Sequence, residues 1–210
     1  VHLHNHTHHS LLDGLTKIPA LINKVKELGM EAVAITDHGT MSGVIDFYKT
    51  AKAEGIKPII GMEAYVATRS RHDRDPQKDK ARYHLIILAM NNTGYQNLMR
   101  LSSIANLEGM YYKPRIDKEL LEKYNEGLII LSGCAGGELG ENLQADNYDE
   151  AKSIAAWYKS IFGDRYYLEM QDHGHLEYPK TWKVQTKING YLEKISDELD
   201  IPLVVTSDGH

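Results

Sequence analysis

Histidines crowd the first ten residues of the chain, Val-His-Leu-His-Asn-His-Thr-His-His-Ser, and three of them alternate with other residues. In a β-strand successive side chains point to opposite faces, so His2, His4 and His6 would share one face of the strand. A row of imidazoles on one face is a donor set for a divalent metal ion. A purification tag and a solvated histidine-rich strand are the alternatives. A tag is a contiguous run, however, and would not continue into Ser10-Leu11-Leu12-Asp13-Gly14, which returns a carboxylate by a turn.

The composition limits what one chain can hold. The 210 residues, 42% of them hydrophobic, suit one α/β domain whose core is large enough to stand without disulfides. The single cysteine, Cys134, excludes an internal disulfide, and no apolar N-terminal stretch resembles a signal peptide or a membrane span. We therefore predict a cytoplasmic protein with no membrane partner. The start without Met and the end at Asp-Gly-His indicate a piece of a longer chain.

Short apolar β-branched runs alternate with amphipathic stretches along the whole chain. The runs are typical of strands and the amphipathic stretches of helices. This alternation predicts parallel strands joined by right-handed crossovers, and seven units suffice to close a β/α barrel. An open doubly wound sheet is the alternative. The predicted strands cover residues 1–6, 32–36, 57–61, 84–89, 127–132, 165–170 and 202–206, and the predicted helices cover 16–30, 40–55, 93–108, 149–162 and 179–199.

One segment interrupts this alternation. Residues 69–82 are highly charged, contain Pro76 and separate two strand-like runs. We expect an exposed hairpin loop at about 69–82, with residues 64–68 and 83–89 paired antiparallel. The whole chain, residues 1–210, is expected to form a single domain.

Side chains that bind metals follow most of the predicted strands, and barrel enzymes place their chemistry at the carboxyl ends of strands. His84 is the exception, because it starts its strand and the hairpin would have to carry it to the same rim. Singly these are weak signals, since a lone Cys134 is most often a small buried hydrophobe and a lone His84 a satisfied core histidine. Together they bring imidazole, carboxylate and thiolate to one rim, a set suited to borderline divalent metals. The candidate ligands are His4, His6, Asp13, His38, Glu63, His84, Cys134, Asp208 and His210.

Eight stretches of the sequence carry a family resemblance: HLHNHTHHSLLDG, AITDHG, GIKPIIGMEAYV, YHLIILAMNNTGYQNL, EGMYYKPRID, GLIILSGCAGGELG, YYLEMQDHG and VVTSDGH. Over essentially the whole chain, they resemble the PHP (polymerase and histidinol phosphatase) domain of bacterial replicative DNA polymerase III alpha subunits. The resemblance implies a distorted seven-stranded β/α barrel with up to three divalent ions, zinc or manganese, at the carboxyl-terminal rim of the strands. The nine candidate ligands match the family's pattern without substitution, whereas some members have lost ligands and, with them, the metal chemistry. Glu63 is the expected bridge between metals.

The resemblance also implies an activity. A member with a complete site is expected to be a metal-dependent phosphodiesterase, a 3′→5′ exonuclease that removes misincorporated nucleotides. Coordination can lower the pKa of water to about 7, so a metal-bound hydroxide, held by the ligands, would attack the phosphate without a protein nucleophile. His2 and Asp37, which adjoin ligands, are expected to orient them, with simple packing or turn roles as the alternative.

The expected partners are a DNA 3′ end, single-stranded or mismatched, the remaining domains of the parent polymerase, and other replisome subunits. The net charge of −5 argues against a broad electrostatic grip on nucleic acid, so contact would be local. Lys113 and Arg115, beside two tyrosines, are predicted to hold a phosphate and stack on an unpaired base, with a structural Tyr-Pro loop as the alternative. His173 is expected at the mouth of the site.

Two other functions remain open. Relatives in the same superfamily hydrolyse small phosphate monoesters such as histidinol phosphate, and the metal ligands alone do not separate these enzymes from a DNA nuclease. The SLLDG, FYKTAK and YYKPRID stretches favour the polymerase. The other candidate is a non-catalytic scaffold, in which metals stabilise the fold and the surface docks a separate proofreading subunit. The complete ligand set argues against it.

Overall fold

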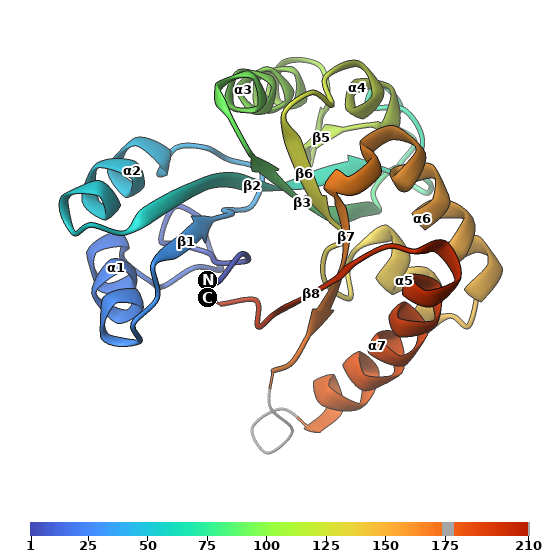
Figure 1. The fold of residues 1–210 in the computed structure, drawn as a ribbon. Coiled ribbons are helices and arrows are strands. Elements are labelled where there is room, and N and C mark those ends of the chain that lie inside the picture. The colour runs from blue at the N-terminus through green and yellow to red at the C-terminus, as the bar shows by residue number, and fades with distance from the viewer. Residues whose placement is uncertain (174–178, 210) are drawn as a thin grey trace.

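The computed structural model describes residues 1–173 and 179–209. A mixed sheet curls on itself at the centre, with helices on its outside (Figure 1). Its strands are β1 (Ala32–Ile35), β2 (Lys57–Ala67), β3 (Arg82–Ala89), β4 (Met110–Tyr111), β5 (Lys113–Ile116), β6 (Leu128–Leu131), β7 (Tyr166–Gln171) and β8 (Leu203–Thr206). The helices are α1 (Ile18–Glu27), α2 (Val44–Ala53), α3 (Asn92–Leu107), α4 (Lys118–Lys123), α5 (Glu138–Gln144), α6 (Tyr148–Phe162) and α7 (Pro179–Leu199), with a 3-10 turn at Gly163–Arg165. Within the described ranges, no helix is both long and apolar enough to cross a membrane.

The sheet follows the order β4-β5-β2-β3-β6-β7-β8, and β1 pairs with the first half of β2. The pairs β1–β2, β6–β7 and β7–β8 are parallel, as the strand-helix alternation predicts. β3 runs antiparallel to both of its neighbours, β2 and β6. The predicted distorted β/α barrel is confirmed as a curled mixed sheet, and the open doubly wound sheet is wrong.

Residues 1–6, which we call the closing segment, do not form the regular strand that their alternation predicts. The segment lies between β1 and the residues after β8, so the two chain ends are close together (Figure 1). The backbone N–H groups of Ala34 and Thr36 donate to its carbonyls, and the N–H of Gly209 does so from the other side. The N–H of Asn5 donates to the Thr36 hydroxyl instead of a backbone carbonyl, which interrupts a regular ladder. The segment nevertheless joins the two ends of the sheet.

The β2–β3 hairpin brings His84 to the same rim as the ends of the parallel strands. Seven residue pairs hold its antiparallel register, in which His84 lies opposite Tyr65, two residues beyond Glu63. The antiparallel pairing expected around the charged segment is therefore confirmed. The expectation of an exposed loop is wrong in part, because Arg71 and Asp79 within it are buried.

Two ion pairs hold that segment in place, a buried one to Asp117 outside it and a half-exposed one within it. The Arg71 guanidinium lies 3.1 Å from the Asp117 carboxylate, and the Arg69 guanidinium lies 2.6 Å from Asp79. A buried charge is tolerated only when it is paired and hydrogen-bonded. A charged stretch of sequence is therefore not always a solvated one.

The main core lies between the sheet and helices α3 to α7, and a smaller core lies beneath α1 and α2. Leu98, Phe162 and Tyr166 are among the fully buried side chains of the main core. The short elements α4, α5, β4 and β5 were outside the predicted set, because two to seven residues hold too little of a periodic pattern. The predicted Tyr-Pro loop is instead the β4–β5 hairpin, which pairs with β2.

Candidate metal centre

The closing segment and the last described residues together supply one donor set. His4 and His6 are 0% and 1% exposed, and their Nε2 atoms lie 3.2 Å apart. Asp208, after β8, brings Oδ1 within 3.1 Å of the His4 Nε2 and 3.3 Å of the His6 Nε2. Side chains from opposite ends of the chain thus converge on one point.

Glu63, near the middle of β2, is the central member of the cluster. Its carboxylate is buried, and Oε2 lies 3.0 Å from His6 Nε2 and 2.8 Å from His38 Nδ1. The other oxygen, Oε1, lies 2.9 Å from His84 Nδ1. Because its two oxygens face different imidazoles, this carboxylate has the geometry of a bridging ligand.

Asp13 and Cys134 extend the cluster on either side. Asp13 Oδ2 lies 2.6 Å from His38 Nε2, and Cys134 Sγ lies 3.6 Å from His84 Nδ1. Among the described residues, three overlapping sets have ligand atoms within 4.8 Å of one another: His4, His6 and Asp208; His6, His38 and Glu63; Glu63, His84 and Cys134. Asp13 adjoins the second set through His38. The ninth candidate ligand, His210, lies outside the described residues.

Opposite charges compensate one another in this cluster. Burial would lower the pKa of His6, but its hydrogen bonds to Asp208 and Glu63 raise that pKa to about 9. Burial would raise the pKa of Glu63, but the surrounding histidines hold it well below its usual range. For the Cys134 thiol, burial and the nearby Glu63 carboxylate both raise the pKa. Bound cations would replace protons here, because coordination favours the neutral imidazole and the thiolate.

Glu169, a functional candidate that sequence reasoning missed, lies behind His4 on β7. It is fully buried, and its Oε1 lies 2.6 Å from His4 Nδ1 and accepts the Thr206 hydroxyl at 2.5 Å. This contact keeps a proton on Nδ1 and turns Nε2 toward the cluster, the usual arrangement behind a metal-binding histidine. The one signal in the sequence was an acidic residue inside the otherwise strand-like Tyr-Tyr-Leu-Glu-Met.

Asp37 reaches the cluster through Ser10. The Ser10 hydroxyl donates to Asp37 Oδ1 at 2.8 Å, and its oxygen lies 3.2 Å from His6 Nδ1. The same oxygen accepts the backbone N–H of His38 at 3.1 Å. Asp37 therefore has the position required to orient two histidines, with Ser10 as the intermediary.

The other predicted residues lie farther from the cluster. His2 bonds to the Ser207 hydroxyl, 2.6 Å from its Nε2, and so contacts the residue before Asp208 rather than a ligand side chain. His173 Nε2 lies 3.2 Å from Gln171 Oε1, and the Gln171 amide in turn lies 3.3 Å from His4 Nδ1.

Arg115 does not face a substrate, and its predicted role in phosphate binding is wrong. Its side chain is 0% exposed, and the guanidinium donates to four backbone carbonyls at 2.8–3.2 Å. These carbonyls belong to Gly109 and to three residues of the charged segment, Arg71, Asp73 and Asp79. Arg115 thus fixes that segment to β5, whereas the Lys113 side chain lines a cavity on the surface.

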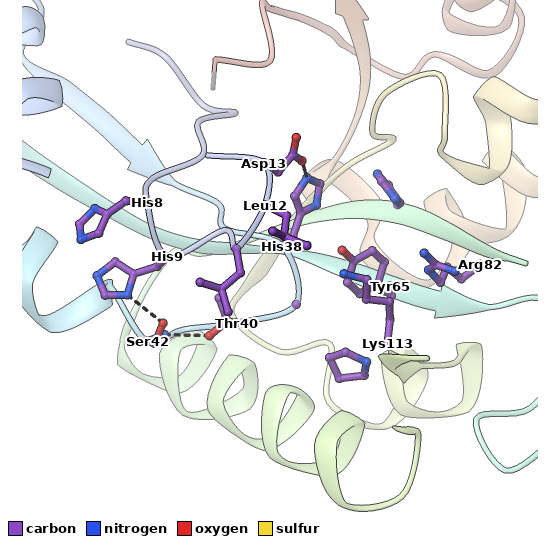
Figure 2. A pocket seen from close by; sticks show the side chains of 14 residues that line it. His8, His9, Leu12, Asp13, His38, Thr40, Ser42, Tyr65, Arg82 and Lys113 are labelled. Carbon is purple, nitrogen blue, oxygen red and sulfur yellow. Dashed lines mark hydrogen bonds and ion pairs between the residues drawn. The ribbon is translucent and has the colours of Figure 1, made fainter. Parts of the chain in front are cut away.

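A cavity of about 590 Å³ opens beside the cluster, and Figure 2 shows the side chains that line it. Asp13, His38 and His84 form one part of its wall, and Lys113 lies in another. Three of the candidate ligands are thus accessible from this cavity, where a substrate could approach them.

The sequence and the fold both match known proteins. The model of the PHP domain family matches residues 2–173. The chain belongs to the PHP domain family. This PHP domain is 50% identical to the DNA polymerase III subunit alpha of Treponema pallidum and 48% identical to those of Borreliella burgdorferi and Thermus aquaticus. Each match covers 100% of the chain but only 17–18% of the relative.

Solved structures support the fold of this PHP domain. A candidate metal-dependent phosphoesterase from Bifidobacterium adolescentis superposes with a TM-score of 0.58 at 14% identity, covering 100% of this chain and 87% of the other. A two-domain protein of Bacteroides vulgatus, described as containing a predicted PHP-like metal-dependent phosphoesterase, gives 0.56 at 15% identity and covers 100% and 51%. At these identities, the likeness establishes the architecture.

Proposed function

We propose that this PHP domain is a metal-dependent phosphodiesterase that removes nucleotides from DNA 3′ ends, proofreading for a replicative polymerase. The observation that carries the proposal is the meeting of three ligand sets at His6 and Glu63, beside an open cavity. A purely structural metal site is normally closed by protein ligands, whereas a catalytic site keeps a position open. The DNA polymerase III subunits alpha among the relatives supply the choice of DNA as substrate.

The donors fit borderline divalent ions such as zinc or manganese, because imidazole, carboxylate and thiol side chains converge with little exposure. His4, His6 and Asp208 would hold one ion, His6, His38 and Glu63 a second, and Glu63, His84 and Cys134 a third, with Asp13 and His210 as further ligands. Divalent ions in such a site supply a nucleophile from water and neutralise charge on the phosphate.

The protein's own groups prepare this site for the ions. Glu169 holds the His4 ring in place from Nδ1, and Ser10 does the same for His6. Both contacts direct Nε2 of the ring toward Glu63. On the substrate side, Lys113 lines the cavity and would neutralise phosphate charge, and His173 stays a candidate for the mouth of the site.

Two alternatives are retained for this site: a phosphatase of small monoesters, and a scaffold in which the metals only stabilise the fold. The deciding experiment follows a 3′-mismatched primer at single-nucleotide resolution, with manganese or zinc and the purified chain. The H4A/H6A variant is the matched control. Stepwise shortening from the 3′ end, absent in the control, would support the proposal. Intact primer with metal demonstrably bound would refute it, and release of phosphate from histidinol phosphate would then favour the phosphatase.

A further inference from the structure

Two cations line the cavity without a carboxylate partner. Arg82 begins β3, Lys113 begins β5, and both lie in the cavity wall. Neither forms an ion pair within the described part of the chain. The Arg82 Nε is buried and has no hydrogen-bond partner there. In a chain of net charge −5, two unpaired cations at one cavity indicate an anionic ligand.

Tyr65 connects these cations to the candidate metal ligands. Its ring centroid lies 5.4 Å from the Arg82 guanidinium carbon and 5.6 Å from Lys113 Nζ. The same centroid lies 5.9 Å from the His38 ring and 5.4 Å from the His84 ring. Figure 2 shows Tyr65 between His38 and Arg82. The two cations and two of the candidate metal ligands thus surround one aromatic ring, so the cations lie beside the metal-ligand cluster.

We infer that Arg82 and Lys113 bind the phosphate that adjoins the scissile one, which makes the substrate a polynucleotide rather than a small phosphate monoester. The inference rests on the proposed function, because the scissile phosphate would occupy the candidate metal cluster. A monoester has one phosphate and would leave the cation pair unused. A polynucleotide carries a phosphate on each nucleotide and can occupy both positions at once.

The remaining wall of the cavity suits the sugar and base of a nucleotide. Leu11 and Leu12, in the turn after the closing segment, are 82% and 107% exposed and line the same cavity. Leu12 holds a φ of 70°, a left-handed conformation that costs a non-glycine residue about 1 kcal/mol or more. Apolar side chains exposed beside a charged site provide contact surface for an unstacked base.

The first test is DNA binding by the whole chain, measured by fluorescence anisotropy with a labelled oligothymidine in chelator, over a series of salt concentrations. Each phosphate contact contributes about 0.7 to the slope of log affinity against log salt for a single strand. R82Q and K113Q should each lower the slope by about that amount, and the double variant by about twice as much. R100Q and K49Q remove the same charges from exposed helix positions and should leave the slope unchanged. Equal slopes in all variants, or no binding by the wild-type chain, would overturn the inference.

The second test separates the adjoining phosphate from the scissile one. It compares a mismatched oligonucleotide with the p-nitrophenyl ester of thymidine 5′-phosphate, which contains one phosphodiester. We expect R82Q/K113Q to raise KM for the oligonucleotide about tenfold or more and to raise KM for the ester far less. Equal losses on both substrates would contradict an adjoining site. If the wild-type chain hydrolyses neither while the salt slopes still change, the proposed function fails and the anion site stands.

Discussion

Replacing Glu169 by Gln tests whether the buried carboxylate behind His4 tunes a metal site. The variant keeps the size of the side chain and a hydrogen-bond acceptor for Thr206, but it removes the charge 2.6 Å from His4 Nδ1. Partners behind metal-bound histidines typically contribute 10–100-fold to metal affinity, which is about 1.4–2.8 kcal/mol. Glu169 is fully buried and therefore little screened, so we expect the upper part of this range.

The assay is a competition between the protein and a chromophoric chelator for zinc, followed by the same titration with manganese. E193Q is the matched control, because Glu193 is exposed on α7 and makes no ion pair among the described residues. Circular dichroism in chelator would establish that E169Q retains its secondary structure. A folded E169Q with wild-type affinity for both metals would refute the role assigned to Glu169.

Three further predictions concern the fold and its coupling to metal. R115M removes the side-chain donor of four backbone carbonyls, of which only that of Gly109 keeps the Arg115 backbone N–H, and should cost about 3 kcal/mol or more in urea unfolding. Unchanged stability with weaker DNA binding would show that Arg115 reaches substrate after all. In G94A the new Cβ would lie 1.8 Å from the Gly127 carbonyl oxygen, so the free energy of unfolding should fall by about 2 kcal/mol. G190A, which adds a Cβ in open space on α7, should leave the free energy of unfolding unchanged or raise it. Equal effects of the two substitutions would contradict this packing. When free metal is kept at 100 times its Kd, binding at one site should stabilise the fold by about 2.7 kcal/mol, and a chelator should remove this stability, seen as a lower Tm in calorimetry. An unchanged Tm after demonstrated metal removal would show that metal does not stabilise the fold.

The candidate ligands could be predicted because imidazole, carboxylate and thiolate are the side chains that bind divalent metals and because strand ends share a rim. His38 and Glu63 follow that rule directly, and eight of the nine candidates lie within the described cluster. His84 required a tertiary feature, the β2–β3 register, that the sequence indicated only through the charged interruption. The types of the side chains thus predicted the candidate site better than the exact boundaries of the strands did.

Glu169, Ser10 and Arg115 show where sequence reasoning failed. A glutamate or a serine is common in any chain, so its role appears only when the contacts to His4 and His6 are known. Lys113 and Arg115 are two residues apart and would share a face of a regular strand, yet Lys113 lines the cavity and Arg115 is fully buried. The sequence offered two similar cations, and only the hydrogen bonds of Arg115 to backbone carbonyls distinguished them.

The position of the cluster couples metal binding to closure of the sheet. Main-chain contacts of the closing segment to β1 and to Gly209 join the two ends of the sheet, without a regular ladder. His4 comes from that segment, Asp208 from the end of the chain and Glu63 from β2. An ion bound by these side chains would therefore connect three parts of the sheet that backbone pairing holds only weakly. Metal affinity and closure of the sheet should consequently rise or fall together.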